Sequence, residues 1–126
     1  MRKRLLSLLF LSLYGSMLFA QEPLDINDVE RVPLGDFTYQ WRNIYDRTPL
    51  HGKCRIILSY RSYTIAHFNK DGILDGLYEK YEDNHLVQKL TYVKGILRGK
   101  GYEYYTDGTV KKECVWNEQG KIDGLM

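Results

Sequence analysis

The sequence lacks a strong charge imbalance. Its 126 residues carry 18 lysines and arginines against 16 aspartates and glutamates. Three of the basic residues lie in a leader-like segment, residues 1–20, that contains no acid, so the rest of the chain has 15 basic and 16 acidic residues (18 − 3 = 15). Domains that bind nucleic acids are normally strongly basic, because they neutralise phosphates. We therefore expect no nucleic-acid partner and find little support for contact with an anionic membrane surface.

Catalytic and metal-binding motifs are also absent from the sequence. The histidines His51, His67 and His85 stand far apart along the chain, and no cysteine or histidine pair has the spacing of a zinc site. No Gly-x-Ser-x-Gly, Walker-type or His-Glu-x-x-His pattern occurs. Acids beside glycines are typical of turns and do not follow the order of a calcium loop. We predict no metal, no cofactor and no enzymatic activity; a small secreted enzyme or inhibitor that uses the histidines is an alternative.

Long hydrophobic runs are missing outside the N-terminus. There, basic residues 2–4 precede an apolar run over residues 5–19, and the small residue Ala20 stands before polar Gln21. A secretory signal has its parts in this order, and the run is shorter than the roughly 20 residues that span a bilayer. Residues 1–20 are therefore predicted to be a signal peptide cleaved after Ala20. The mature protein is expected to be periplasmic or secreted, and a retained leader that anchors the chain is the alternative.

What the sequence does contain is an internal repeat. Three copies of Gly-x-x-x-Gly begin at Gly72, Gly95 and Gly120, so they recur at nearly equal intervals along the chain. Each of the first two copies is followed by an aromatic segment, a turn and a second extended run whose apolar residues alternate, as in a strand. The unit is predicted to be a β-hairpin. Its turns fall at Asp83-Asn84 and at Asp107-Gly108, where a type I′ turn needs residues that tolerate positive φ.

Aligning the second strands of the units places apolar residues in two columns. Large aromatic residues recur once in each unit at an almost constant interval, and we call this column the structural ladder: Tyr45, Phe68, Tyr92 and Trp116. Smaller apolar residues recur two positions earlier in each unit: Ala66, Leu90 and Cys114. Residues two apart in a strand share a face, so both columns are expected to point the same way.

The predicted fold is all-β, an elongated single-layer antiparallel sheet of repeated hairpins. Residues 48–126 form the repeats, and residues 21–47 form a linker and a degenerate N-terminal capping strand, in which Phe37, Tyr39 and Trp41 alternate. In such an array Cys54 and Cys114 lie five strand steps apart. Five steps amount to about 24 Å, whereas the two Cα atoms of a disulfide lie within roughly 7 Å. We therefore expect no disulfide between these cysteines.

Two of these segments, residues 72–81 and 99–108, resemble bacterial variant MORN repeats of the kind labelled YwqK-type antitoxin. The resemblance extends over residues 48–126 and departs from the pattern at Thr48 and Ser62, where glycines are missing. It implies an elongated sheet that serves as a scaffold or interaction surface. It also implies an antitoxin-like protein whose partner is a cytoplasmic toxin, but that expectation conflicts with the export signal.

The function predicted from these features is an exported, non-enzymatic repeat protein that acts as a binding or scaffold module in the cell envelope. The aromatic segments at residues 77–81 and 101–105 become equivalent if one extra residue is allowed between Gly99 and Tyr102. The tyrosines of both segments are expected to be exposed. The partner is expected to be a protein, which docks on these tyrosines or adds a strand to the array. The predicted binding residues are Tyr78, Tyr102 and Tyr104. The sequence does not predict an oligomeric state.

Overall fold

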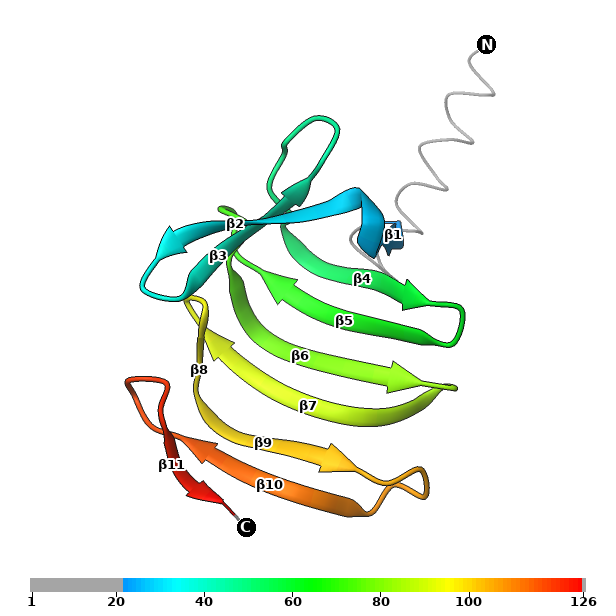
Figure 1. Cartoon of the computed structure of the whole chain (residues 1–126), viewed down its shortest axis with the longest axis vertical. Coiled ribbons are helices and arrows are strands. Elements are labelled where there is room, and N and C mark those ends of the chain that lie inside the picture. The colour runs from blue at the N-terminus through cyan, green and yellow to red at the C-terminus, as the bar shows by residue number, and fades with distance from the viewer. Residues whose placement is uncertain (1–21, 126) are drawn as a thin grey trace, which may run out of the picture.

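The computed structural model describes residues 22–125, which form an almost entirely β structure (Figure 1). Consecutive strands pair as antiparallel hairpins in a large sheet, and the predicted fold class is confirmed. The predicted signal peptide, residues 1–20, lies outside the described residues. Among residues 22–125, no helix is long and apolar enough to cross a membrane.

The large sheet has the strand order β1-β4-β5-β6-β7-β9-β10-β11, with the short β8 paired to β7. Its strands are β1 (Leu24–Asp25), β4 (Gly52–Ser59), β5 (Ser62–Phe68), β6 (Leu74–Glu82), β7 (His85–Val93), β8 (Ile96–Leu97), β9 (Gly99–Tyr104), β10 (Val110–Trp116) and β11 (Ile122–Leu125). A 3-10 turn (Ile26–Asp28) leads from β1 into a separate hairpin, which consists of β2 (Val29–Gly35) and β3 (Thr38–Asn43).

Three successive hairpins share the same register. In each, a ring on the second strand stands opposite a glycine on the first, and these pairs are Gly52–Phe68, Gly76–Tyr92 and Gly99–Trp116. The pairs two positions further along are Cys54–Ala66, Tyr78–Leu90 and Gly101–Cys114. The constant interval between the rings therefore places Phe68, Tyr92 and Trp116 at equivalent positions of neighbouring hairpins.

Tyr45 does not belong to the structural ladder. It lies between β3 and β4, its side chain is 76% exposed, and its hydroxyl donates a hydrogen bond of 2.9 Å to Oδ1 of Asp28. The interpretation of the first part of the chain as a linker was also wrong, because residues 24–35 form β1, the 3-10 turn and β2. Pro33 fits into β2 because that strand has one free edge, where no N–H donor is needed.

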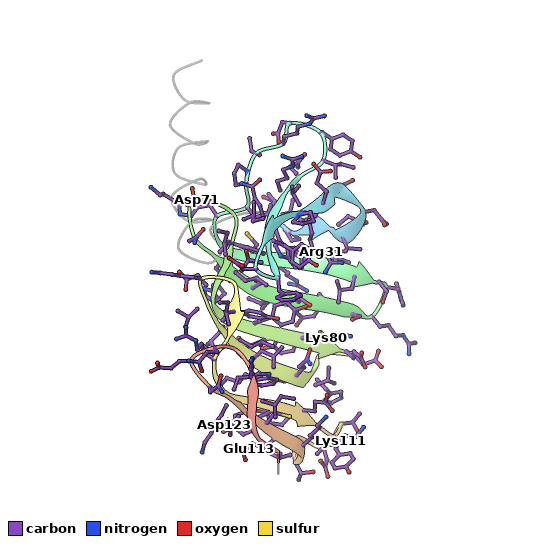
Figure 2. All side chains as sticks on the ribbon, turned by 60° about the vertical axis from the view of Figure 1, so that its left-hand side comes forward. Arg31, Asp71, Lys80, Lys111, Glu113 and Asp123 are labelled. Atoms are coloured by element: carbon purple, nitrogen blue, oxygen red, sulfur yellow. The ribbon has the colours of Figure 1, made fainter. Side chains whose placement is uncertain are left out.

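The apolar core forms where β3 crosses one face of the large sheet (Figures 1 and 2). The ring centroids of Trp41 and Phe68 are 5.6 Å apart, and Trp41 is 9% exposed. Its backbone N–H donates to the carbonyl of Gly72 at 2.7 Å. Gly72 has a φ of 76°, and a Cβ there would collide with the Trp41 carbonyl, so the position requires glycine. The remaining core residues are Leu50, Cys54, Ile56, Ala66 and Leu74.

The two predicted turns differ in their geometry. Asp83 and Asn84 have φ values of 49° and 64°, as a two-residue type I′ turn requires. The turn at Asp107-Gly108 is longer than predicted, because Tyr105 N donates to the Thr109 carbonyl and closes a wider loop. Of its two central residues only Gly108 has a positive φ, of 90°.

At the opposite end of the strands the glycine-containing turns stack on one another. A Cβ on Gly95 would lie 3.1 Å from Cγ2 of Ile73, and a Cβ on Gly120 would collide with Cγ2 of Ile96. Each glycine thus makes room for the isoleucine of the preceding turn. These two glycines, which open the second and third Gly-x-x-x-Gly copies, are therefore packing positions as well as turn positions.

Candidate functional site: an aromatic groove

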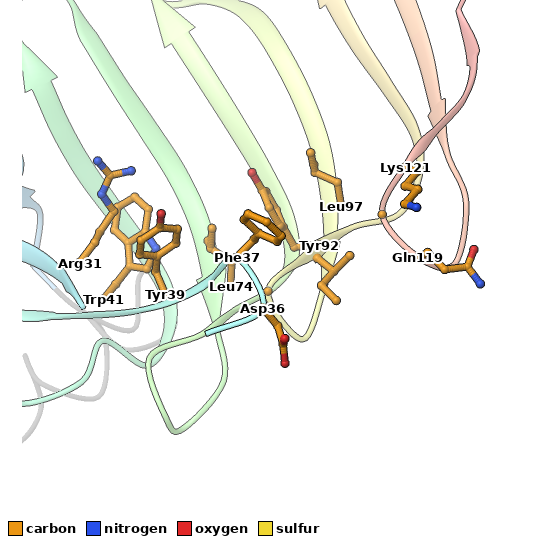
Figure 3. A pocket seen from close by; sticks show the side chains of 13 residues that line it. Arg31, Asp36, Phe37, Tyr39, Trp41, Leu74, Tyr92, Leu97, Gln119 and Lys121 are labelled. Carbon is orange, nitrogen blue, oxygen red and sulfur yellow. The ribbon is translucent and has the colours of Figure 1, made fainter. Parts of the chain in front are cut away.

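A groove of about 530 Å³ lies between the β2–β3 hairpin and the turns at one end of the large sheet (Figure 3). We call it the aromatic groove. Its apolar lining consists of four rings and three aliphatic side chains: Phe37, Tyr39, Trp41, Tyr92, Leu74, Ile96 and Leu97. Its polar side chains are Arg31, Asp36, Gln119 and Lys121. The volume falls within the range of about 300–1,000 Å³ that is usual for ligand sites.

The hairpin supplies three of the rings through the two-residue period of an extended chain. Tyr39 and Trp41 lie on the same face of β3, and Phe37 precedes them in the turn. Their exposure increases toward the turn: Trp41 is buried at 9%, Tyr39 is 43% exposed and Phe37 is 97% exposed. The hairpin is therefore anchored by Trp41 and presents its other two rings to solvent.

The turn that carries Phe37 has an unusual backbone. Gly35, Asp36 and Phe37 have φ values of 92°, 51° and 63° in succession. The left-handed region costs an ordinary L-residue about 1–2 kcal/mol, and a bulky residue there is an outlier. Burial of the Phe37 ring does not offset this cost, because almost all of the side chain is in solvent. Strained residues of this kind cluster at ligand-binding elements.

Two contacts orient the side chains around the rings. The guanidinium carbon of Arg31 lies 5.4 Å from the ring centroid of Trp41 and 5.9 Å from that of Tyr39. Tyr92 packs edge-on against Tyr78, with 5.9 Å between the ring centroids. Burial, followed by the charge of Tyr78, raises the pKa of the Tyr92 hydroxyl. The Tyr92 hydroxyl is therefore neutral at neutral pH.

The structure does not bring the three predicted binding tyrosines together. Tyr78 stands opposite Leu90 and packs against the core, whereas Tyr102 stands opposite Lys89 and points to the other face of the sheet. Tyr104 shares the face of Tyr102, and their ring centroids are 6.0 Å apart. All three side chains are half-buried.

A register error of one residue explains this difference. The extra residue assumed between Gly99 and Tyr102 made Tyr102 equivalent to Tyr78. In the sheet, however, it is Gly101 that pairs with Cys114 as Tyr78 pairs with Leu90. A shift of one position moves a strand residue to the opposite face.

The histidines form no common site. His51 precedes β4 at one end of the strands, and His85 begins β7 at the other end. His67 lies in β5, where it is half-buried opposite Lys53. Residues 22–125 contain no group of three or more histidine, cysteine or acidic side chains that could hold a metal ion.

No family model matches the chain, and no curated protein matches it either. Among solved structures, the chain is similar to a crystal structure of TarM, with 14% sequence identity, a TM-score of 0.42 and coverage of 78% of this chain and 19% of that chain. A mutant of S. aureus TarM in complex with fondaparinux, alpha-GlcNAc-glycerol and UDP gives 15% identity, the same TM-score and coverage of 79% and 20%. This chain thus spans about a fifth of the length of the TarM structures that it matches.

These matches correct the predicted function. The prediction was an exported, non-enzymatic binding or scaffold module in the cell envelope, but the matched structures belong to a glycosyltransferase. At a TM-score of 0.42, the similarity transfers neither an activity nor a ligand to this chain.

Proposed function

We propose that the aromatic groove binds an extended segment of a partner protein. The observation that carries the proposal is Phe37, whose ring is 97% exposed on a backbone with a φ of 63°. Contact between this large apolar ring and water is unfavourable. A molecule that covers the ring and the neighbouring half-exposed Tyr39 would remove that contact. The strained turn thus holds the ring where an occupant of the groove would meet it.

The chemistry of the lining favours a polypeptide over a carbohydrate. Sugar hydroxyls need several hydrogen-bonding partners, but the side chains of Asp36 and Gln119 point away from the row of rings (Figure 3). Between Arg31 and Lys121, which stand at its two ends, the groove is lined mainly by rings and aliphatic side chains. Aromatic-lined grooves are suited to extended, proline-rich segments, which lose little conformational entropy when they bind.

The hairpin array itself fits the resemblance to variant MORN repeats. The support comes from the recurrent pairing of a glycine with a ring, as in Gly76–Tyr92 and Gly99–Trp116, and from the stacked turns at Gly95 and Gly120. In this proposal the array is the rigid platform, and the β2–β3 hairpin adds the recognition surface to it.

Peptide binding to matched variants tests the proposal. The probe is an array of synthetic extended peptides with proline, leucine and tyrosine at their centres. We expect a subset to bind the wild type, and the double variant Phe37→Ser, Tyr39→Ser to bind the same peptides at least about tenfold more weakly, a loss of about 1.4 kcal/mol. The control is Tyr60→Ser, because Tyr60 is 96% exposed and lies in the turn between β4 and β5, outside the groove.

Tryptophan fluorescence reports occupancy of the groove directly. The chain has two tryptophans, so Trp116→Phe leaves Trp41, which lines the groove, as the remaining emitter. Peptides that bind in the groove should change this emission. The proposal fails if the double variant binds as tightly as the control, or if a neutral oligosaccharide changes the emission and the peptides do not.

A further inference from the structure

The charged side chains of the aromatic groove are distributed unevenly. Figure 3 shows Arg31 and Lys121 at opposite ends of the row of rings, and it shows the carboxylate of Asp36 pointing away from the row. Both cations are exposed. The ion pairs formed within residues 22–125 involve other side chains, so neither of these cations is neutralised by a described carboxylate.

Arg31 is held in place before any ligand arrives. It stands opposite Trp41 in the β2–β3 pair, and its guanidinium group lies over the rings of Trp41 and Tyr39. Such contacts restrict the planar guanidinium while its N–H groups stay free to donate. A carboxylate suits this arrangement, because it accepts two parallel hydrogen bonds from a guanidinium.

Lys121 marks the other end of the groove. It follows Gly120 in its turn, as Ile73 follows Gly72 and Ile96 follows Gly95. The two isoleucines pack against the glycine of the next turn, whereas Lys121 is exposed and borders the groove. An amino group thus occupies a position that is apolar in the equivalent turns.

We infer that the groove selects a segment that is apolar in its middle and acidic at both ends. This inference rests on the proposed function and names the class of segment that would be bound. The rings cover the apolar middle, and Arg31 and Lys121 each attract one carboxylate. A segment with basic ends would be repelled at both ends.

Three synthetic peptides that differ in their ends test the inference. They share one central run of proline, leucine and tyrosine, and they end in glutamates, in glutamines or in lysines. We expect the glutamate peptide to bind the wild type about tenfold more tightly than the glutamine peptide at low salt. The lysine peptide should bind most weakly, and the difference between the three should shrink as salt is added.

Charge variants separate the two ends of the groove. Arg31→Gln and Lys121→Gln should each reduce the ratio between the affinities for the glutamate peptide and the glutamine peptide about threefold. Lys111→Gln is the matched control, because Lys111 is an exposed cation 5.9 Å from the ring centroid of Tyr105, outside the groove. It should not change the preference.

The outcomes distinguish the inference from the proposed function. Equal affinities for the glutamate and glutamine peptides, or tighter binding of the lysine peptide, would overturn the inference and leave peptide binding in the groove intact. A preference that Lys111→Gln weakens as much as Arg31→Gln would overturn it too. Absence of binding by all three peptides would remove the proposed function together with the inference.

Discussion

Gly101 shows how a single residue decides the packing of a whole strand. It pairs with Cys114 in β10, at the position that Tyr78 and Cys54 occupy in the other hairpins. A Cβ at Gly101 would overlap the ring of Trp116 and would lie 2.8 Å from Cδ2 of Leu90. The space that a side chain at position 101 would occupy is therefore filled by the ring of Trp116, which reaches across from the next strand.

Replacement of Gly101 by alanine should destabilise the protein through overpacking. We expect Gly101→Ala to lower the free energy of unfolding by about 1–3 kcal/mol. Alanine is compatible with the strand backbone, but its Cβ would overlap the neighbouring side chains. Gly124→Ala is the control, since the nearest atom to its Cβ would be 3.8 Å away, and the change should stay within about 0.5 kcal/mol. Urea denaturation measures both; equal losses would contradict the role of Trp116.

Tyr92 should make stability depend on pH in the alkaline range. Burial, followed by the charge of Tyr78, raises the pKa of its hydroxyl in the folded protein. Above about pH 10 the tyrosine of the unfolded chain loses its proton, whereas Tyr92 of the folded protein retains it. Deprotonation therefore lowers the free energy of the unfolded state, and the stability falls as the pH rises. Tyr92→Phe removes this contribution.

Urea midpoints measured between about pH 8 and pH 11 check this prediction, because the range spans the ordinary tyrosine pKa. The fall in stability above about pH 10 should be shallower in Tyr92→Phe than in the wild type. Tyr60→Phe, which changes an exposed residue in a turn, should leave the fall as it is. A Tyr92→Phe profile that matches the wild type would show that the burial of this hydroxyl does not affect folding.

Among the elements, the β2–β3 hairpin joins the large sheet through few contacts. Its two strands are tied to each other by an ion pair of 2.6 Å between Arg42 Nε and Glu30 Oε1, which are cross-strand neighbours. Its attachment to the sheet depends on Trp41, through the ring contact with Phe68 and the hydrogen bond to Gly72. Together with the hydrogen bond of 3.0 Å that Gln40 Nε2 donates to the Asp71 carbonyl, Trp41 therefore positions the element that forms a wall of the aromatic groove.

Truncation of Trp41 should release the hairpin from the sheet. We expect Trp41→Ala to cost about 3–5 kcal/mol and to abolish peptide binding at temperatures where the large sheet is still folded. Phe37→Ala, by contrast, should change stability by at most about 0.5 kcal/mol while it weakens binding, because its ring is exposed.

Amide hydrogen exchange separates the two effects in Trp41→Ala. Exchange should accelerate in residues 29–43 before it accelerates in β5 and β6, because local openings begin where contacts are fewest. Uniform acceleration over the chain would mean that the hairpin and the sheet unfold as a single unit.

At the scale of the whole molecule, the apolar core is concentrated at one end of the array. The buried apolar side chains of the described residues belong to β3–β6 and the segment before β4, with Cys114 of β10 as the exception. The later hairpins share stacked turns and half-buried rings instead. Stability should therefore decrease from β4 toward β11, as in repeat proteins whose units contact only their neighbours.

The two cysteines allow this gradient to be measured. Cys54 lies on β4 in the core and Cys114 on β10, and both thiols are buried. In native protein without reductant, we expect a thiol reagent to modify Cys114 faster than Cys54, because the β9–β11 end opens more often. The variants Cys54→Ala and Cys114→Ala isolate the two rates, and equal rates would contradict the gradient.

The repeat architecture was predictable because its signals are local. Strand alternation, the turn residues Asp83 and Asn84, and the constant interval between rings all lie within one or two units of the chain. The place of Phe68, Tyr92 and Trp116 in the sheet follows from them. The face occupied by Tyr102 did not follow, because one residue of register reverses the face and the slightly unequal intervals between the glycine motifs allow either alignment.

The aromatic groove depends on contacts that no local pattern contains. The alternation of Phe37, Tyr39 and Trp41 indicated a strand, but the position of that strand is set by its bond to Gly72, far along the chain, and by the turns that carry Gly95 and Lys121. Hydrophobic periodicity in a strand indicates that one of its faces is buried. Which element covers that face depends on steric fit between residues that are far apart in the sequence. Spacing therefore specifies the hairpins, and long-range packing creates the groove.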